Sequence, residues 1–213
     1  MDSLAEYGFT VFGEHVAITE LIGQAAAVSV VLLAARRTLW VWPAQILATV
    51  LLFIVYTDAD LGGLRDRQVA ILVISALGWS AWWRHRKDLF GMPVRRARRV
   101  EWLLLAAAMV VGTAGYGWYL QATDSSWAPW PDAWIFVGSI VAFAAQARGL
   151  VEFWFVWLAV DAVGVPLQLD SGLWFSASVY VVFAVLVVRG YLVWARLARR
   201  EAARRATEDA ALE

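Results

Sequence analysis

One stretch of the chain places several chemically capable side chains at helical spacing. Trp154, Trp157, Asp161, Gly164 and Gln168 follow the intervals i, i+3, i+7, i+10 and i+14, so a helix puts them on one face. Indole rings stack on flat aromatic ligands, whereas a carboxylate and an amide bond polar edges. The alternatives are an interfacial position for Trp154 and a structural partner for Asp161 on another helix.

A second stretch repeats this mixture of side chains. When the sequence is aligned with itself so that Trp154 falls on Trp42, the same face continues through Gln45, Thr49, Leu52 and Tyr56. We call this alignment the repeat register. Both stretches combine aromatic with hydrogen-bonding side chains. We therefore predict that Trp42, Gln45, Thr49, Trp154, Trp157, Asp161 and Gln168 line one binding cavity.

Another two polar residues flank the short connection at Arg148 and Gly149. Gln146 precedes it and Glu152 follows it. A gate at this point and simple solvation explain the pair equally well.

Composition decides what kind of element must carry these residues. Of 213 residues, 62% are hydrophobic and 17% are charged, with 14 tryptophans, two histidines and no cysteine. A soluble domain is about 45–50% apolar and about 25% charged. Such a composition excludes a soluble globule, a disordered chain and a disulfide scaffold, and indicates an all-α, polytopic membrane protein.

Seven apolar stretches have about the length that crosses ~30 Å of hydrocarbon as a helix. We predict spans at about 17–35, 39–57, 68–83, 101–120, 132–147, 150–168 and 173–195. Residues 132–147 and 150–168 are parted only by Arg148 and Gly149, which leaves counts of six or eight open.

Charged residues alternate between the connections, although formal net charge is +0. Arginine gathers after the first, third, fifth and seventh spans, at Arg36, Arg37, Arg84, Arg86, Arg95, Arg96, Arg98, Arg99, Arg148, Arg196, Arg199 and Arg200. The other connections are acidic, with Asp58, Asp60, Asp66, Asp124, Asp132 and Asp170, and Arg65 and Arg67 among them. The positive-inside rule then predicts a multi-pass plasma-membrane protein with its N-terminus outside and its C-terminus in the cytoplasm.

The repeat register extends beyond the two polar faces. It pairs Arg36 with Arg148, Asp58 with Asp170, Gly78 with Gly190, Trp82 with Trp194 and Arg84 with Arg196. We predict a parallel 3+1+3 repeat of the kind found in SWEET transporters, in which one linker helix restores the direction of the second triplet. Its segments are an extracytoplasmic N-terminus (1–16), a first repeat (17–83), a basic cytoplasmic loop (84–100), a linker helix and outer loop (101–131), a second repeat (132–195) and a cytoplasmic tail (196–213).

Seven of the 14 tryptophans divide into two groups by position. Trp82, Trp127, Trp130 and Trp194 lie at predicted span ends or in loops, where a bilayer interface explains them. Trp42, Trp154 and Trp157 lie on the two inward faces, which a bilayer does not explain.

Motifs for enzymatic chemistry are missing from the sequence. There is no phosphate-binding loop, and His15 and His85 fall outside the predicted spans. We expect neither an enzyme nor a bound metal or cofactor. The arginine clusters fit membrane topology and anionic lipid headgroups, so nucleic acid is not expected as a partner.

The sixth span resembles a family signature. Trp154-x-x-Trp157-x-x-x-Asp161 is similar to the Trp-x-x-Trp-x-x-x-Asn/Asp run of the PnuC family of bacterial vitamin transporters. Stretches such as Trp42-Pro-Ala-Gln45, Trp130-Pro-Asp-Ala133 and Ala145-Gln-Ala-Arg-Gly149 resemble its actinobacterial riboflavin (RibM) branch, and the resemblance covers all but the tail.

This resemblance implies facilitated diffusion of a vitamin, which a cytoplasmic kinase then traps by phosphorylation. The kinase is expected to form no stable complex with the transporter. Aspartate at the last signature position favours riboflavin, with nicotinamide riboside and thiamine as alternatives within the family. A membrane sensor or scaffold that binds the ligand without moving it is the alternative of another class. Membrane lipids are expected partners, and a homo-oligomer stays open.

Overall fold

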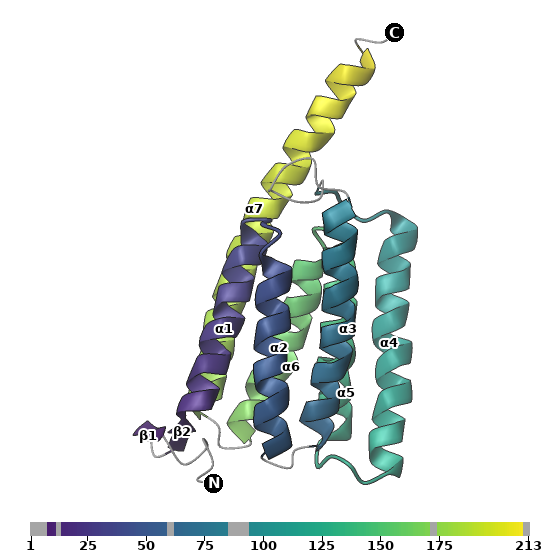
Figure 1. The fold of residues 1–213 in the computed structure, drawn as a ribbon. Coiled ribbons are helices and arrows are strands. Elements are labelled where there is room, and N and C mark those ends of the chain that lie inside the picture. The colour runs from purple at the N-terminus through teal and green to yellow at the C-terminus, as the bar shows by residue number, and fades with distance from the viewer. Residues whose placement is uncertain (1–7, 12–13, 59–61, 85–93, 171–173, 211–213) are drawn as a thin grey trace.

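The structure is a computed structural model that describes residues 8–11, 14–58, 62–84, 94–170 and 174–210. Within these residues it contains seven helices and one short hairpin (Figure 1). The helices are α1 (Ile18–Ala35), α2 (Val41–Asp58), α3 (Gly62–Arg84), α4 (Arg99–Ala122), α5 (Pro129–Ala147), α6 (Phe153–Asp170) and α7 (Trp174–Ala210). The hairpin consists of β1 (Gly8–Val11) and β2 (Glu14–Ala17), paired antiparallel.

Each helix coincides with one of the seven predicted apolar spans, and three differences stand out. The hairpin was not expected, because its strands are too short for a hydropathy pattern. Helix α3 begins at Gly62, so Asp66 and Arg67, expected in a loop, are helical. Helix α7 continues to Ala210 because the alanine-rich tail has high intrinsic helix propensity.

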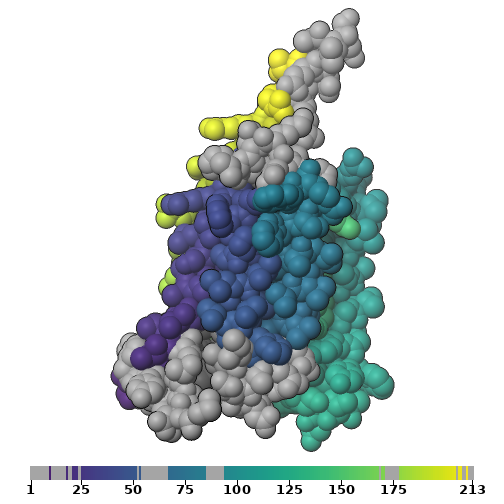
Figure 2. Space-filling view, viewed as in Figure 1, coloured from purple at the N-terminus to yellow at the C-terminus, as the bar shows by residue number. Residues whose placement is uncertain are grey.

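Six of the helices form a closed ring. Along it, α1 contacts α2, α2 contacts α3, α3 contacts α5, α5 contacts α6, α6 contacts α7, and α7 returns to α1. Helix α4 packs on α5 from outside the ring, and Figure 1 shows it at the margin of the bundle. The side chains of α1, α2 and α3 form a continuous surface on the face shown in Figure 2.

The outer surface of the bundle is apolar. Helix α4 and the stretch Ser178–Arg204 of α7 are long and apolar enough to cross a membrane, yet only 17% and 22% of their apolar windows are buried. Leu103, Val111 and Trp118 of α4 are each more than half exposed. An apolar helix with most of its surface exposed fits contact with lipid better than the core of a soluble domain.

Four buried indoles pack together in the larger of two core clusters. We call Trp42, Trp82, Trp154 and Trp194 the tryptophan quartet; each side chain is at most 1% exposed. Trp42 meets Trp82 edge-on with ring centroids 5.6 Å apart, and Trp154 meets Trp194 edge-on at 6.1 Å. The centroids of Trp82 and Trp194 are 6.5 Å apart, so the quartet joins α2 and α3 to α6 and α7.

Two glycines make room for the quartet. A methyl group added at Gly78 of α3 would lie 2.4 Å from the Trp42 ring, and one added at Gly190 of α7 would lie 2.4 Å from the Trp154 ring. Small residues let helices approach closely where no water-driven hydrophobic force joins them. Each indole therefore sits directly against the backbone of the neighbouring helix.

The two helices α1 and α5 end in the same way. Arg37 and Gly149 both adopt a positive φ, of 55° and 67°. The amides of Arg37 and Thr38 bond the carbonyls of Ala34 and Leu33, and the amides of Gly149 and Leu150 bond those of Gln146 and Ala145. This pair of bonds is the Schellman motif, and its two occurrences match in the repeat register. Both motifs lie at what we call the basic end of the bundle, where α1, α3 and α5 end near Arg36, Arg84 and Arg148.

The glycine contacts predict the effect of single methyl groups. We expect Gly78→Ala and Gly190→Ala each to lower the free energy of unfolding by about 1–3 kcal/mol, because the indole has to move out of a packed core. Thermal unfolding in detergent measures this change.

Gly115→Ala in α4 is the matched control, since its methyl group would meet no atom within 4 Å. That variant should gain about 0.5–1 kcal/mol from helix propensity. Equal effects at Gly115 and Gly190 would contradict close contact between glycine and indole.

Candidate functional site

The polar face of α6 is divided between two neighbouring helices. Trp154 rests on Gly190 of α7, and a methyl group at Gly164 would lie 2.5 Å from the Tyr180 ring of the same helix. Trp157 turns instead to α5, where it meets Phe143 edge-on with ring centroids 5.3 Å apart. Of the three tryptophans expected to line the cavity, only Trp157 is partly exposed.

Asp161 lies one turn from Trp157 and is buried, with 6% of its surface exposed. Its Oδ2 atom has no hydrogen-bond partner within the described structure. A buried carboxylate oxygen without a partner carries an unmet desolvation cost. Asp161 is thus an open acceptor inside the bundle.

The corresponding face of α2 carries a linked pair. The Gln45 amide donates to the Thr49 hydroxyl over 3.1 Å, and Thr49 is 1% exposed. In the repeat register Gln45 matches Trp157 and Thr49 matches Asp161. The two faces therefore supply different chemistry at matching positions.

Further buried polar groups lie on α3, and sequence reasoning assigned them no role. Ser75 is fully buried and its hydroxyl has no partner among the described residues, while Gln68 is 5% exposed. Both share a helix face with Gly78 and Trp82, which points toward α2 and α5. The helical spacing of Gln68 and Ser75 with Gly78 and Trp82 was the sequence signal that could have identified them as inward-facing.

Arg67 was expected in an outer loop, but its side chain reaches from α3 to α5. It donates to the Ser139 hydroxyl over 3.3 Å, and its buried Nε has no described partner. Arginine can cross between these helices because its long stem packs on apolar surface while its head finds an acceptor.

Two tryptophans predicted at a bilayer interface lie elsewhere. Trp82 and Trp194 were expected at a bilayer interface, but both are fully buried. Trp127 and Trp130 are 72% and 47% exposed, as an interfacial position requires.

The rings of Trp42 and Trp154 are covered by glycine-bearing helices, and their Nε1 atoms have no partner within the described structure. The side chain of Gln168 lies outside the described residues.

The pair for which a gate and simple solvation both stay open, Gln146 and Glu152, lies at the basic end. Gln146 is 2% exposed, and its amide nitrogen has no described partner. Glu152 is 4% exposed, and its carboxylate accepts the backbone N–H of Ala97 over 2.8 Å. Glu152 thereby fixes the segment that leads into α4.

Further bonds hold the same segment. The backbone of Arg95 bonds the amide of Val151 and the carbonyl of Gly149, each over 3.0 Å, and the amide of Val94 bonds the Glu201 carboxylate. Arg95 also pairs with Glu101 through two bonds of 2.6 and 2.7 Å, which raise the pKa of the Arg95 guanidinium. Helix α4 is thus tied to α5, α6 and α7.

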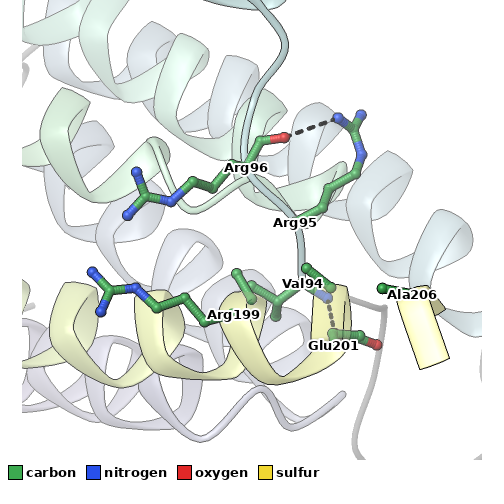
Figure 3. Close-up of a pocket in the computed structure, with 8 residues that line it drawn as sticks. Val94, Arg95, Arg96, Arg199, Glu201 and Ala206 are labelled. Atoms are coloured by element: carbon green, nitrogen blue, oxygen red, sulfur yellow. Dashed lines mark hydrogen bonds between the residues drawn. The ribbon is translucent and has the colours of Figure 1, made fainter. Parts of the chain in front are cut away.

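A surface pocket of about 480 Å³ lies beside this segment (Figure 3). Its lining is formed by Val94, Arg95, Arg96, Ala198, Arg199, Glu201, Ala202 and Ala206. Arg96 and Arg199 extend to one side of it, while Arg95 points to the other (Figure 3). None of the residues predicted to bind a ligand lines this pocket. Among the described residues, no group of three His, Cys, Asp or Glu side chains could hold a metal ion.

Comparison with known proteins agrees with this architecture. Residues 17–196 match the family model described as nicotinamide mononucleotide transporter. The riboflavin/roseoflavin transporter RibM of Streptomyces davaonensis is 40% identical over 204 residues, which cover 94% of this chain and 95% of that protein. The nicotinamide riboside transporter PnuC of Neisseria mucosa is 25% identical over 161 residues, 70% of this chain and 60% of that one.

A solved structure extends the likeness to the fold. The crystal structure of the vitamin B3 transporter PnuC superimposes with a TM-score of 0.69 and 22% identity, covering 84% of this chain and 81% of that one. These relatives are transporters, and none is named as an enzyme. The chain therefore belongs to the nicotinamide mononucleotide transporter family, which also contains PnuC-like proteins, and is a membrane protein.

Proposed function

We propose that the chain carries riboflavin across the plasma membrane by facilitated diffusion. The observation that carries this proposal is the partly exposed Trp157 indole one turn from the buried, unpartnered Asp161 oxygen, inside a closed ring of helices. A similar protein, 40% identical over nearly its whole length, is named a riboflavin/roseoflavin transporter.

The proposed ligand suits the chemistry of this interior. Riboflavin combines a flat fused ring with carbonyl, N–H and hydroxyl groups. Trp157 would stack on the ring, and Asp161, Thr49, Gln45 and Gln168 would bond its polar edges. Because the faces of Trp42 and Trp154 are covered, these two residues would contribute through their unpartnered Nε1–H groups rather than by stacking.

Nicotinamide riboside is the second candidate within the same mechanism. Its support is the 25% identical relative that carries it by name. Thiamine is a third. A sensor that binds a vitamin without moving it would use the same interior, and only transport across a bilayer separates the two classes.

The ring of helices divides into two halves, α1–α3 and α5–α7. Their likeness supports a repeat, and a repeat makes transport feasible. We infer that residues 17–83 and 132–195 are two copies of one three-helix unit, with α4 as the linker. Supporting this, the helix caps, the glycine–indole contacts and the helix pairs α3–α5 and α1–α7 all recur in the repeat register. A site between two such copies can open to either side as they rock against each other.

The arginine-rich connections set the proposed orientation. The positive-inside rule places the basic end and the C-terminus in the cytoplasm and the N-terminus outside. The sequence has no phosphate-binding loop, so we propose that the vitamin gradient drives uptake and that a cytoplasmic kinase maintains this gradient by phosphorylation.

Substrate identity is tested by a ligand panel on the purified protein. We expect riboflavin at about 100 times its Kd to raise the melting temperature by roughly 5–10 °C, because a ligand of the folded state adds its binding energy to stability. Nicotinamide riboside and thiamine are measured at the same concentration. A larger shift with either of them would replace riboflavin as the substrate.

Transport is tested with the protein in liposomes. We expect riboflavin to equilibrate across the bilayer, and Trp157→Ala to slow uptake at least about tenfold, since a stacking partner is lost. Trp118→Ala is the control, because that indole is 68% exposed on α4. Binding without equilibration would support the sensor, and normal uptake by Trp157→Ala would remove the site.

Variants of Glu152 separate two roles of this residue: anchoring the segment before α4, and a gate that needs the carboxylate charge. We expect Glu152→Ala to lower the free energy of unfolding by about 1–3 kcal/mol, because the Ala97 amide loses its acceptor. Glu152→Gln should stay near the wild type in stability and uptake, since the amide oxygen can accept the same bond. Arg148→Ala, at an exposed position, is the control. Loss of uptake in a stable Glu152→Gln variant would show that the gate requires the charge.

A further inference from the structure

The indole N–H groups of Trp82 and Trp194 bond across the two halves of the ring. Trp194 of α7 donates to the carbonyl of Ala34, near the end of α1, over 3.0 Å. Trp82 of α3 donates to the carbonyls of Gln146 and Ala147, at the end of α5, over 3.3 and 3.2 Å. In the repeat register Trp82 matches Trp194 and Ala34 matches Gln146, so the two bonds are reciprocal.

The acceptors are chemically suited to this task. The carbonyls of Ala34 and Gln146 already accept one amide each from the Schellman motifs, so the indoles use their second lone pairs. Carbonyls at a helix C-terminus carry partial negative charge, which strengthens their bonds to donors. They also move with the helix to which they belong.

The indole bonds join the halves at the basic end of the bundle. The acceptors lie in the last turns of α1 and α5, and the donors lie two positions before Arg84 and Arg196. The rings of Trp82 and Trp194 also contact each other there, and both are fully buried. An interior route to the basic end has to pass between the helices that these indoles hold together.

We propose that Trp82 and Trp194 are the gating residues at the basic end, and that this structure shows their gate closed. Opening breaks the indole–carbonyl bonds of both tryptophans and separates α3 from α5 and α1 from α7 together. The inference rests on the proposed transport function, because a gate is needed only if a ligand passes. It assigns to two tryptophans the gating role that was one of two open explanations for Gln146 and Glu152, of which Gln146 supplies a backbone acceptor.

Distances between spin labels at the basic end test the gate without any vitamin. The chain contains no cysteine, so labels attach only at introduced positions. Arg36→Cys with Arg196→Cys reports on α1 and α7, and Arg84→Cys with Arg148→Cys reports on α3 and α5; all four positions are exposed. We expect short distances to dominate for both pairs in lipid nanodiscs.

Trp82→Phe and Trp194→Phe keep an aromatic ring but remove the N–H donor. Each variant should raise the ratio of long to short distances about three- to tenfold, the range for one interhelical hydrogen bond. The change should occur at both pairs, because the halves move as units. Trp127→Phe, in an exposed loop position, should change neither distribution.

Unchanged distances in both phenylalanine variants would overturn the gate, as would a change confined to the pair beside the substituted indole. If a phenylalanine variant fails to fold, 3-benzothienylalanine at the same position keeps the two-ring shape without the N–H, and the same outcomes decide. The labels respond to the gate alone. Responsive distances in a protein that moves no riboflavin would leave the gate standing and remove the proposed substrate.

Discussion

The rest of the structure depends on the contact between a buried indole and the backbone of the next helix. Within lipid, apolar side chains gain little by leaving one apolar surface for another, so helices associate through close packing and interhelical hydrogen bonds. Trp42 on Gly78 and Trp154 on Gly190 provide the packing, and Trp82 and Trp194 provide the bonds. Together they fix α2 against α3, α6 against α7, and one half of the ring against the other.

Contacts within and between the halves differ in kind. Within each half, indole rings lie in glycine slots that any separation would leave empty, so these contacts favour movement as a unit. Between the halves, α3 meets α5 and α1 meets α7, with indole donors on helix-end carbonyls and with Arg67 on the Ser139 hydroxyl. Such bonds can be exchanged for others at modest cost. Helix α4 belongs with the second half, because Glu152, Glu201 and the backbone at Gly149 hold the segment before it.

Hydropathy was sufficient to predict the helices, and register was sufficient to find the matching residues, but neither shows the direction of a side chain. Trp82 and Trp194 lie near the ends of apolar spans, which is also where interfacial tryptophans lie, so sequence position alone favoured the wrong environment. Their match in the repeat register, together with that of Gly78 and Gly190, was the signal of a shared structural role. Arg67 was misplaced for a related reason: a charge shortens an apolar window even where a helix continues through it.

The expected site combines residues that the fold treats differently. Trp42 and Trp154 match in the repeat register, and each rests against a glycine of the neighbouring helix. One turn further, the register pairs Gln45 with Trp157 and Thr49 with Asp161, and the likeness ends there. A ligand with a ring at one end and hydroxyl groups along the other has no two-fold symmetry of its own. The proposed transport would use the repeated frame for movement and an asymmetric lining for recognition. The residues that hold the helices should therefore resemble each other between the halves, whereas the residues proposed to bind the ligand should differ, as the pair Thr49 and Asp161 does.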